Sequence, residues 1–273
     1  MSHPTMRLEV RSRKSGYMTG GELVAYLVSR GVNFGEEREE ILLEQYSRGN
    51  VPQFLRTLYP FEMHAGDDTY ILYCLPDYLC VGSNEDFVHT PMAPATAQRI
   101  ADEWGLVIGT PEMEDARRAY FPQRLGFRPM APPEYPRDGS MMHTSRWPIH
   151  TRWFLEDMKK AGYTVGLPVT GHKKCIITHP WLVVWGFAHC GVHGAYYTKS
   201  DKAIHVFEEN ARAHIPKYSD YSHGAMLYHP TVFRLNADGA AKAAGQTIIE
   251  KVMSKQPKPL SRRQFSKSPR YPV

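Results

Sequence analysis

The 273-residue chain lacks the short motifs that mark several large classes of enzyme. It has no glycine-rich loop followed by a helix and an acidic residue, which argues against chemistry driven by a bound nucleotide. It has no HExxH motif and no CxxC pair, so a structural zinc site of the usual spacing is not expected. It also has no GxSxG motif, which argues against an ordinary α/β-hydrolase. We therefore expect no cofactor.

Cysteine is scarce as well. The chain contains Cys74, Cys80, Cys175 and Cys190, which is sparse for a secreted domain held together by disulfides. We therefore predict that all four thiols are reduced. The alternative is a bridge between Cys74 and Cys80, which lie on the two sides of a predicted turn.

Long apolar runs are also missing. No stretch is apolar over about 18 residues, so no membrane span and no membrane partner are expected. No apolar run follows a basic region near the N-terminus, as it would in a secretory signal. The expected location is therefore cytoplasmic, with delivery elsewhere by a particle as the alternative.

Acidic residues are scarce at the two ends of the chain. The C-terminal tail, residues 254–273, contains several Lys and Arg residues and neither Asp nor Glu, and residues 6–16 are also rich in basic side chains. The net charge of +5 and the pI of about 8.9 therefore describe the ends more than the body. A tail of this composition should be disordered in isolation, and it is a candidate contact for a protein or nucleic-acid partner.

The residues that are present indicate a folded protein with a substantial core. Apolar residues make up 42% of the chain and aromatic residues 12%. Residues 1–66 are predicted to form an N-terminal helical unit, in which Thr19 and Glu22 form a capping box before the first helix. The three helices expected in this unit cover residues 20–31, 36–49 and 51–59.

The hydrophobic period changes after residue 66, and residues 67–253 are predicted to form an α+β domain that carries the candidate site. Strands are expected over residues 68–75, 77–82, 173–180, 181–189 and 224–235. Helices are expected over residues 93–105, 110–121, 151–162 and 239–254. A proline-rich connector without a regular period occupies residues 122–148. This order predicts an α+β fold with a mixed or mainly antiparallel sheet and flanking helices.

Ionisable side chains concentrate in two stretches of this domain. Residues 171–175 (GHKKC) place Lys173 and Lys174 directly before a buried-looking strand. Desolvation lowers the pKa of an ammonium group, so a lysine there is a candidate base or a fixed charge for a carboxylate; a solvated turn is the alternative. The second stretch is residues 214–224 (HIPKYSDYSHG). The candidate catalytic residues are Lys173, Lys174, His214, Tyr218, Asp220, Tyr221, Ser222 and His223.

Residues 220–224 are expected to be extended. Ser222 and His223 then face opposite sides of the strand and cannot pair. A base for Ser222 would come from elsewhere in the chain, with His214 and His193 as the candidates. The alternative is a structural role for Asp220 and Ser222, because both residue types bind backbone N–H groups in tight turns.

The run Ser222-His223-Gly224 resembles the active-site signature of the L,D-transpeptidases, and His193-Gly194 matches the upstream His-Gly of that pattern. Ala225 stands where that family has its catalytic cysteine. A thiolate nucleophile at that position is therefore excluded. The resemblance implies a peptide or cell-wall-type amide substrate.

A broader resemblance covers most of residues 20–230. It is to a bacterial family of uncharacterised proteins whose chains carry a His-x-x-x-Tyr-x-Asp-Tyr-Ser-His-Gly run followed by a strand. The runs that carry it are residues 48–56, 75–102, 171–174 and 214–224. That family has no known activity, so the resemblance implies one fold with one site, in which Lys173 and Lys174 belong with residues 214–224. It also favours His214 over His193 as the base.

The favoured function is a cofactor-independent hydrolase or acyl-transfer enzyme that acts on an anionic or amide-containing substrate. Ser222 or Tyr221 would be the nucleophile or proton donor, and Lys173 would be an electrostatic anchor. His214 and His223 would transfer protons, with Asp220 as the residue that orients them.

Two alternatives remain open. One is a mononuclear metal enzyme that uses the histidine cluster, with ligands drawn from His214, Asp220, His223 and His229. The other is a non-enzymatic structural or assembly protein of a virus particle or large complex, which the proline-rich connector and the basic tail suggest.

Overall fold

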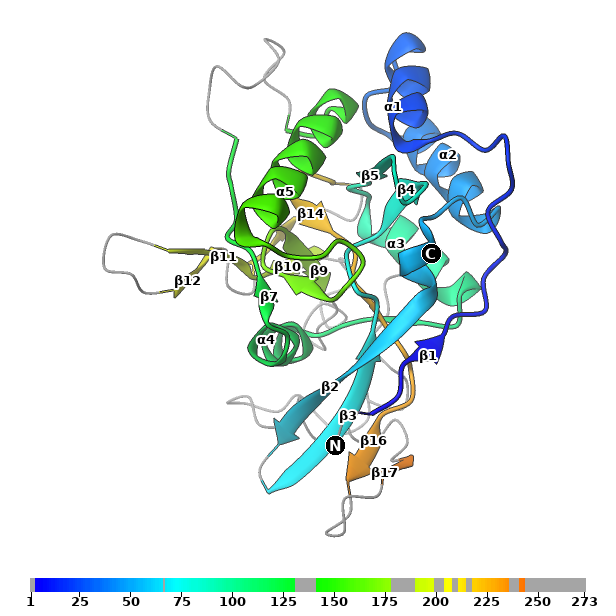
Figure 1. The fold of residues 1–273 in the computed structure, drawn as a ribbon. Coiled ribbons are helices and arrows are strands. Elements are labelled where there is room, and N and C mark those ends of the chain that lie inside the picture. Colours follow the sequence, from blue (N-terminus) through cyan, green and yellow to red (C-terminus); the bar gives the residue numbers. More distant parts are fainter. Residues whose placement is uncertain are drawn as a thin grey trace.

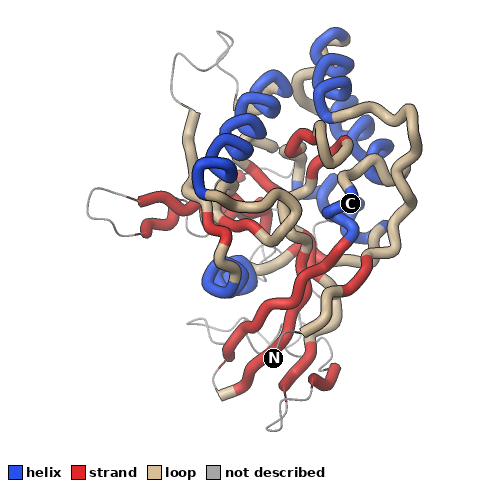
Figure 2. Tube along the Cα trace, viewed as in Figure 1, coloured by secondary structure: helices blue, strands red, loops and turns tan. Residues whose placement is uncertain are grey.

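The computed structural model combines helices with several sheets and confirms the predicted α+β class. It describes residues 3–65, 67–130, 141–177, 190–198, 204–207, 211–214, 218–235 and 241–243. Figure 1 shows three helices gathered at one end, α1 (Gly20–Ser29), α2 (Glu36–Ser47) and α5 (Trp147–Ala161). The hairpin of β2 (Thr57–Ala65) and β3 (Asp68–Cys74) extends away from them, as Figure 2 also shows.

The first two predicted helices form where the sequence placed them. The Thr19 side chain accepts a hydrogen bond from the backbone of Glu22, and the Glu22 carboxylate accepts one from the backbone of Thr19, so the capping box at the start of α1 is confirmed. Three glutamates lie in the first turn of α2, where they complement the helix dipole.

The third predicted helix, over residues 51–59, was wrong. The structure has one short 3-10 helix, η1 (Gln53–Arg56), and then β2. From Phe61 onward buried and less buried residues alternate, with Phe61 and Met63 in the core. Residues 59–65 pair with β3 and residues 57–58 pair with β1. This pairing decides the conformation, and it overrides the helical spacing of the apolar residues before it.

The largest sheet is built on the β2–β3 hairpin. Its main path runs β1–β2–β3–β15–β6, and β16 pairs with both β3 and β17. All the pairings in this sheet are antiparallel. The remaining strands are β1 (Met6–Arg7), β6 (Val107–Ile108), β15 (Leu227–Tyr228), β16 (Phe233–Leu235) and β17 (Ala241–Ala243).

The helix predicted over residues 239–254 was wrong at its start, because residues 241–243 form β17. Alanine-rich sequence favours a helix, but here the backbone pairs with β16 in a hairpin, and such tertiary pairing overrides intrinsic propensity. The rest of that predicted helix and the basic tail, residues 254–273, lie outside the described residues. The strand predicted over 181–189 also lies outside them.

A second sheet contains the strands of the candidate site. Its order is β13–β10–β9–β14, and β9 pairs antiparallel with β10 but parallel with β14. The expected mixed pairing is therefore confirmed. The strands are β9 (Lys174–Ile177), β10 (Cys190–His193), β13 (Ala211–His214) and β14 (His223–Gly224).

The predicted middle helices are confirmed. α3 (Pro94–Glu103) and α4 (Pro111–Tyr120) both begin with a proline, and the Thr110 side chain caps α4. α5 begins at Trp147, earlier than expected, and Gly162 ends it in the left-handed region.

Short ladders complete the described fold. β4 (Cys80–Gly82) pairs antiparallel with β5 (Phe87–His89), and β7 (Gln123–Arg124) pairs in parallel with β8 (Val169–Thr170). A third ladder is the hairpin of β11 (Ala195–Thr198) and β12 (Ile204–Phe207). The remaining element is the 3-10 helix η2 (Thr144–Arg146). Residues 131–140 of the predicted connector lie outside the described part of the chain.

One continuous cluster of buried side chains joins the helices to the large sheet. It includes Leu23 of α1, Leu42 of α2, Phe61 of β2 and Leu227 of β15. Cys74, Cys80 and Cys175 are buried and unpaired, as predicted. Among the described residues, no helix combines the length and apolar character needed to cross a membrane.

Gly224 is the position where the fold most directly constrains the site. A Cβ atom added there would lie 2.5 Å from Cδ1 of Tyr78 and 2.9 Å from Cδ of Lys173. The glycine therefore lets a buried aromatic ring and the stem of a buried lysine pack against the backbone of β14.

We expect Gly224→Ala to lower the free energy of unfolding by about 1–3 kcal/mol, because the added methyl overpacks a filled interior. Denaturation in urea would measure the change. Gly126→Ala is the matched control, since its added Cβ would approach no atom more closely than 3.7 Å, and it should change the free energy by less than about 0.5 kcal/mol. Equal stabilities for the two variants would contradict the packing argument.

Candidate functional site

The two polar stretches of the sequence lie side by side in the second sheet. β14 pairs in parallel with β9, which places His223 opposite Lys174. The backbone N–H of Lys174 donates to the carbonyl of Ser222 at 2.8 Å. The structure thus brings Lys173 and Lys174 next to residues 218–224.

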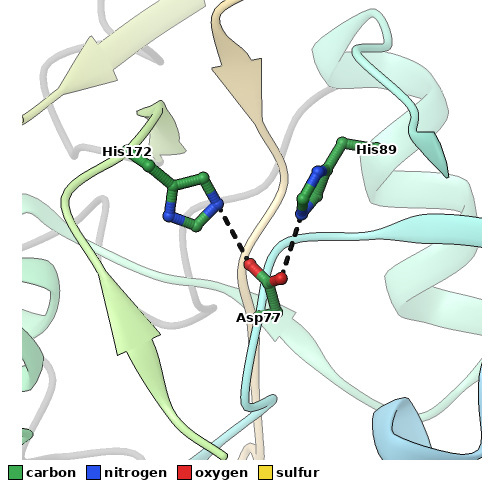
Figure 3. Close-up of side chains that lie close together, drawn as sticks. All are labelled: Asp77, His89 and His172. Atoms are coloured by element: carbon green, nitrogen blue, oxygen red, sulfur yellow. Dashed lines mark hydrogen bonds and ion pairs between the residues drawn. The ribbon is translucent and has the colours of Figure 1, made fainter. Parts of the chain in front are cut away.

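A buried carboxylate, Asp77, lies between two imidazoles close to these strands (Figure 3). Nε2 of His89 is 3.0 Å from Oδ2 of Asp77, and Nε2 of His172 is 3.2 Å from Oδ1. The three side chains are at most 4% exposed. We call these three residues the Asp–His–His cluster.

Three separate segments position the Asp–His–His cluster. Asp77 follows Pro76 in the turn between β3 and β4, and its Oδ1 accepts the backbone N–H of Tyr78 at 2.7 Å. His89 ends β5 and pairs with Cys80 of β4, which returns it to the Asp77 turn. His172 lies in the turn between β8 and β9. The ends of the neighbouring strands therefore fix the backbone positions of Asp77, His89 and His172.

The ionisation of the cluster follows from its burial. Burial lowers the pKa of His89 and lowers that of His172 to about 4, so both imidazoles are neutral at pH 7. Burial alone would raise the pKa of Asp77, but the positive charge of the two histidines in their protonated forms outweighs it and holds the pKa below its usual value. The cluster is a carboxylate held between two neutral imidazoles.

Lys173 directly follows His172 and is 1% exposed. Its Nζ donates to the carbonyl of Tyr221 at 2.9 Å and lies 3.3 Å from Nδ1 of His150. Burial lowers its pKa to about 7, against the attraction of nearby carboxylates. An ammonium group has three N–H donors, so these two partners leave one donor for another acceptor.

His150 comes from α5 and completes the surroundings of Lys173. Burial, together with the nearby Lys173, lowers its pKa well below the usual value. A neutral His150 accepts a hydrogen bond from the ammonium group through Nδ1. Its ring centroid is 5.5 Å from that of Tyr221, so the imidazole is packed in place.

Residues 221–222 form a turn and residues 223–224 form β14, so the expectation of an extended segment over 220–224 was wrong before His223 and right from His223 onward. The backbone N–H of His223 donates to the carbonyl of Asp220 at 2.9 Å. The backbone N–H and the hydroxyl of Ser222 both donate to Oδ1 of Asp220, each at 2.7 Å. These bonds fold the chain back on itself, which is the structural role that the sequence left open for Asp220 and Ser222.

Asp220 is also held by a lysine. Nζ of Lys174 lies 3.6 Å from Oδ2 of Asp220, and both side chains are buried. Burial would raise the pKa of Asp220, but His223, Lys174 and the bonds from Ser222 outweigh it and lower the pKa. An anion stabilised in this way is a weak base, so it is poorly suited to take a proton from Ser222.

The aromatic residues of the turn have structural contacts of their own. The hydroxyl oxygen of Tyr221 accepts the backbone N–H of Met130 at 2.8 Å. The Tyr218 ring packs edge-on against His223, with centroids 5.7 Å apart. Nδ1 of His223 lies 3.5 Å from the backbone N of Asp220.

The metal ligands predicted from the sequence do not form the group found in the structure. His214 lies on β13 with its backbone paired to Cys190, and its side chain is outside the described residues. Nδ1 of His229 accepts the backbone N–H of Thr231 at 3.1 Å, within its own turn. Among the described side chains, the ligand atoms that lie within 4.8 Å of one another belong to the Asp–His–His cluster.

Sequence reasoning missed Asp77, His89 and His150 as site residues. The available signal was a single ionisable residue inside an otherwise apolar stretch. Asp77 stands between the runs 70–76 and 78–82, and His89 follows a buried strand. An ionisable residue in such a stretch needs a buried partner, but nothing in the sequence indicates that Asp77 and His89 are partners of each other.

A second buried cluster, formed by Glu114, Arg117 and Tyr78, contacts the backbone that carries His172. Nη2 of Arg117 pairs with Oε1 of Glu114 at 2.7 Å, and the Tyr78 hydroxyl donates to the same oxygen at 3.0 Å. Nη1 of Arg117 donates to the carbonyl of Val169 at 2.8 Å. The Tyr78 hydroxyl also lies 3.4 Å from the carbonyl of Lys173. These contacts fix the backbone on both sides of His172.

Together the described groups place a carboxylate, three neutral imidazoles and a lysine amine with a pKa of about 7 in one water-poor region. Such a region can accept and donate protons and can stabilise a developing negative charge.

No protein-family model matches the chain, and no significant match was found among curated proteins or among solved structures. Both resemblances noted in the sequence therefore stay predictions.

Proposed function

We propose that the chain is an enzyme of the hydrolase or acyl-transfer class. Its reaction centre is the Asp–His–His cluster, with Lys173 beside it. The observation that carries this proposal is the environment of the Lys173 ammonium group. Its direct partners are a carbonyl and a neutral imidazole, and one N–H donor remains for a substrate.

Arg117 provides a contrast that supports a functional role for Lys173. Arg117 is equally buried, but it pairs directly with the carboxylate of Glu114, and this is the structural way to bury a cation. Among the described residues no carboxylate lies within ion-pair distance of Lys173. A buried cation that lacks a direct counter-ion is costly, and such arrangements cluster at functional sites.

The proposed roles follow from position. The third N–H of Lys173 stabilises the negative oxygen that develops when a carbonyl is attacked. The Asp–His–His cluster activates the attacking water. The substrate class is an amide or ester, and the resemblance of residues 222–224 to L,D-transpeptidases favours a peptide or cell-wall-type amide.

Ser222 and Tyr221 are not the nucleophiles in this proposal. Ser222 donates its hydroxyl to an Asp220 carboxylate that is a weak base, and Tyr221 supplies the carbonyl that holds Lys173. Residues 218–224 therefore act through their backbone: they hold the ammonium group where the reaction needs it.

We expect Lys173→Met to reduce turnover by about 10²–10³-fold, the usual loss for one donor to a developing oxyanion. The free energy of unfolding should change by less than about 2 kcal/mol, because relief of ammonium desolvation offsets two lost hydrogen bonds. Turnover would be measured on a panel of peptide amides and esters. The paired measurement is denaturation in urea.

Lys174→Met is the matched control for this experiment, since the neighbouring lysine contacts Asp220 in the turn. It should keep turnover within about tenfold, as expected for a residue that does not touch the reacting atoms. Equal losses in the two variants would count against the role of Lys173. A wild-type protein that cleaves no member of the panel would exclude the hydrolase class tested.

Ser222→Ala separates this proposal from a serine mechanism. Removing the hydroxyl deletes one hydrogen bond to Asp220, so we expect about 1 kcal/mol of lost stability and turnover within about tenfold of wild type. A serine nucleophile predicts a loss of about 10⁶-fold instead. The same panel and the same denaturation measurement decide between them.

A further inference from the structure

We infer that the Asp–His–His cluster binds one divalent transition-metal ion of the zinc class, and that water on this ion is the nucleophile. The second part rests on the proposed function, whereas the first part does not. This set of ligands differs from the His214, Asp220, His223 and His229 set considered from the sequence.

The donor set and its geometry support a metal site. One oxygen of Asp77 and one nitrogen of each histidine lie within 4.8 Å of one another, and Figure 3 shows a ring nitrogen of each histidine turned toward Asp77. Two imidazoles and one carboxylate form a common ligand set for catalytic zinc and for non-haem iron. Three protein ligands also leave a position open for water.

His172 supplies a second, independent observation. It is 3% exposed, and neither of its ring nitrogens makes a hydrogen bond to the part of the chain that the structure describes. Nε2 is 3.2 Å from Oδ1 of Asp77, but it is not aligned for a hydrogen bond. Buried polar atoms are seldom left without a partner. A metal ion shared by Nε2 and the carboxylate would satisfy this nitrogen, because ligand atoms point at the ion and not at each other.

The surroundings of His89 and Asp77 fit the outer shell of a metal site. Nδ1 of His89 lies 3.4 Å from the hydroxyl of Thr151, and this contact orients the imidazole ring with Nε2 toward Asp77. The Asp77 carboxylate is also fixed by the backbone N–H of Tyr78. Contacts of this kind set the ring orientation and the basicity of metal ligands.

Lys173 is compatible with a cation at this position. It follows His172 in the chain, but its Nζ bonds to His150 and Tyr221 instead of to the cluster. Two positive groups near each other repel unless an anion lies between them. An oxyanion of the substrate would bring the metal ion and the ammonium group together in a favourable way.

The reaction balances as an amide hydrolysis. The oxygen of the metal-bound water forms a bond with the carbonyl carbon, and the amide C–N bond breaks. The proton lost by the water ends on the departing amine. The products are a carboxylic acid and an amine.

Titration of chelator-treated, full-length protein with Co²⁺ tests the site directly. Four-coordinate Co²⁺ bound by nitrogen and oxygen gives visible absorption bands, so we expect a spectrum that saturates at one ion per chain and is displaced by Zn²⁺. Elemental analysis of the loaded protein would confirm the ratio. A wild-type protein that gives no saturable spectrum overturns the inference.

Variants locate the bound ion. Asp77→Asn and His172→Gln should each weaken Co²⁺ binding by at least 100-fold. Asp115→Asn is the matched control, because Asp115 also contacts a buried histidine, with Nε2 of His193 at 2.8 Å, but belongs to no three-ligand group among the described residues. It should bind Co²⁺ like wild type. If all three variants bind like wild type, the ion lies elsewhere and the inference fails.

Thr151→Val gives a milder test, should the ligand variants fail to fold. It leaves the three ligands in place and removes the hydroxyl next to Nδ1 of His89. We expect Co²⁺ affinity to fall by about 10–100-fold, as for other outer-shell partners. An unchanged affinity would contradict the arrangement.

The two proposals fail in distinguishable ways. If the protein binds no metal ion but Lys173→Met loses turnover, the hydrolase proposal stands and the metal inference is wrong. If Co²⁺ binds at the cluster but no substrate is cleaved, the metal site stands and the hydrolase proposal is wrong.

Discussion

The buried carboxylate of Asp77 is the constraint on which the rest of the site depends. A carboxylate without water needs partners, and here the side-chain partners are two imidazoles from β5 and from the turn before β9. Because those segments are distant in sequence, the carboxylate ties the β4–β5 hairpin to the second sheet. The same contact fixes the start of β9, which in turn positions Lys173 beside β14. The buried Asp77 carboxylate thereby helps to set the relative placement of β5, β9 and β14.

Two buried charge clusters in the described part of the chain differ in whether each polar atom has a partner. Arg117 donates to both carboxylate oxygens of Glu114, and the hydroxyls of Tyr78 and Tyr228 donate to the same two oxygens. Every side-chain nitrogen of Arg117 and both carboxylate oxygens of Glu114 have a partner, so this pair is suited to hold the backbone of β8 and β9. In the other cluster, both ring nitrogens of His172 lack a hydrogen bond and one ammonium N–H of Lys173 lacks a partner among the described residues. The first cluster supports the second through the contact of Tyr78 with the carbonyl of Lys173.

Local sequence signals predicted most of the helices, and they failed where tertiary pairing decides. The capping box at Thr19 and the proline at the start of α4 are local devices, so they could be read directly. The strand over residues 57–65 and the hairpin at 241–243 exist because a neighbouring strand is available, which no local pattern reports. The same limit applies to the site. The stretches 171–174 and 218–224 attract attention by their density of ionisable residues, whereas Asp77 and His89 are single residues in apolar surroundings.

The turn before β14 shows how a dense motif can mislead about chemistry. Its Asp, Ser and His side chains suggest a catalytic set, but Asp220 and Ser222 mainly hydrogen-bond within the turn. The turn contributes a backbone carbonyl to the site: the carbonyl of Tyr221 accepts a hydrogen bond from the Lys173 ammonium group. Gly224 completes the arrangement, because only a residue without a side chain lets the Tyr78 ring and the Lys173 stem approach together. A backbone atom has no signature of its own in sequence. The residues that can be recognised in the sequence are those that shape the backbone, here Asp220 and Ser222. Because their side chains are also typical of catalytic residues, a structural turn is easily mistaken for a catalytic set.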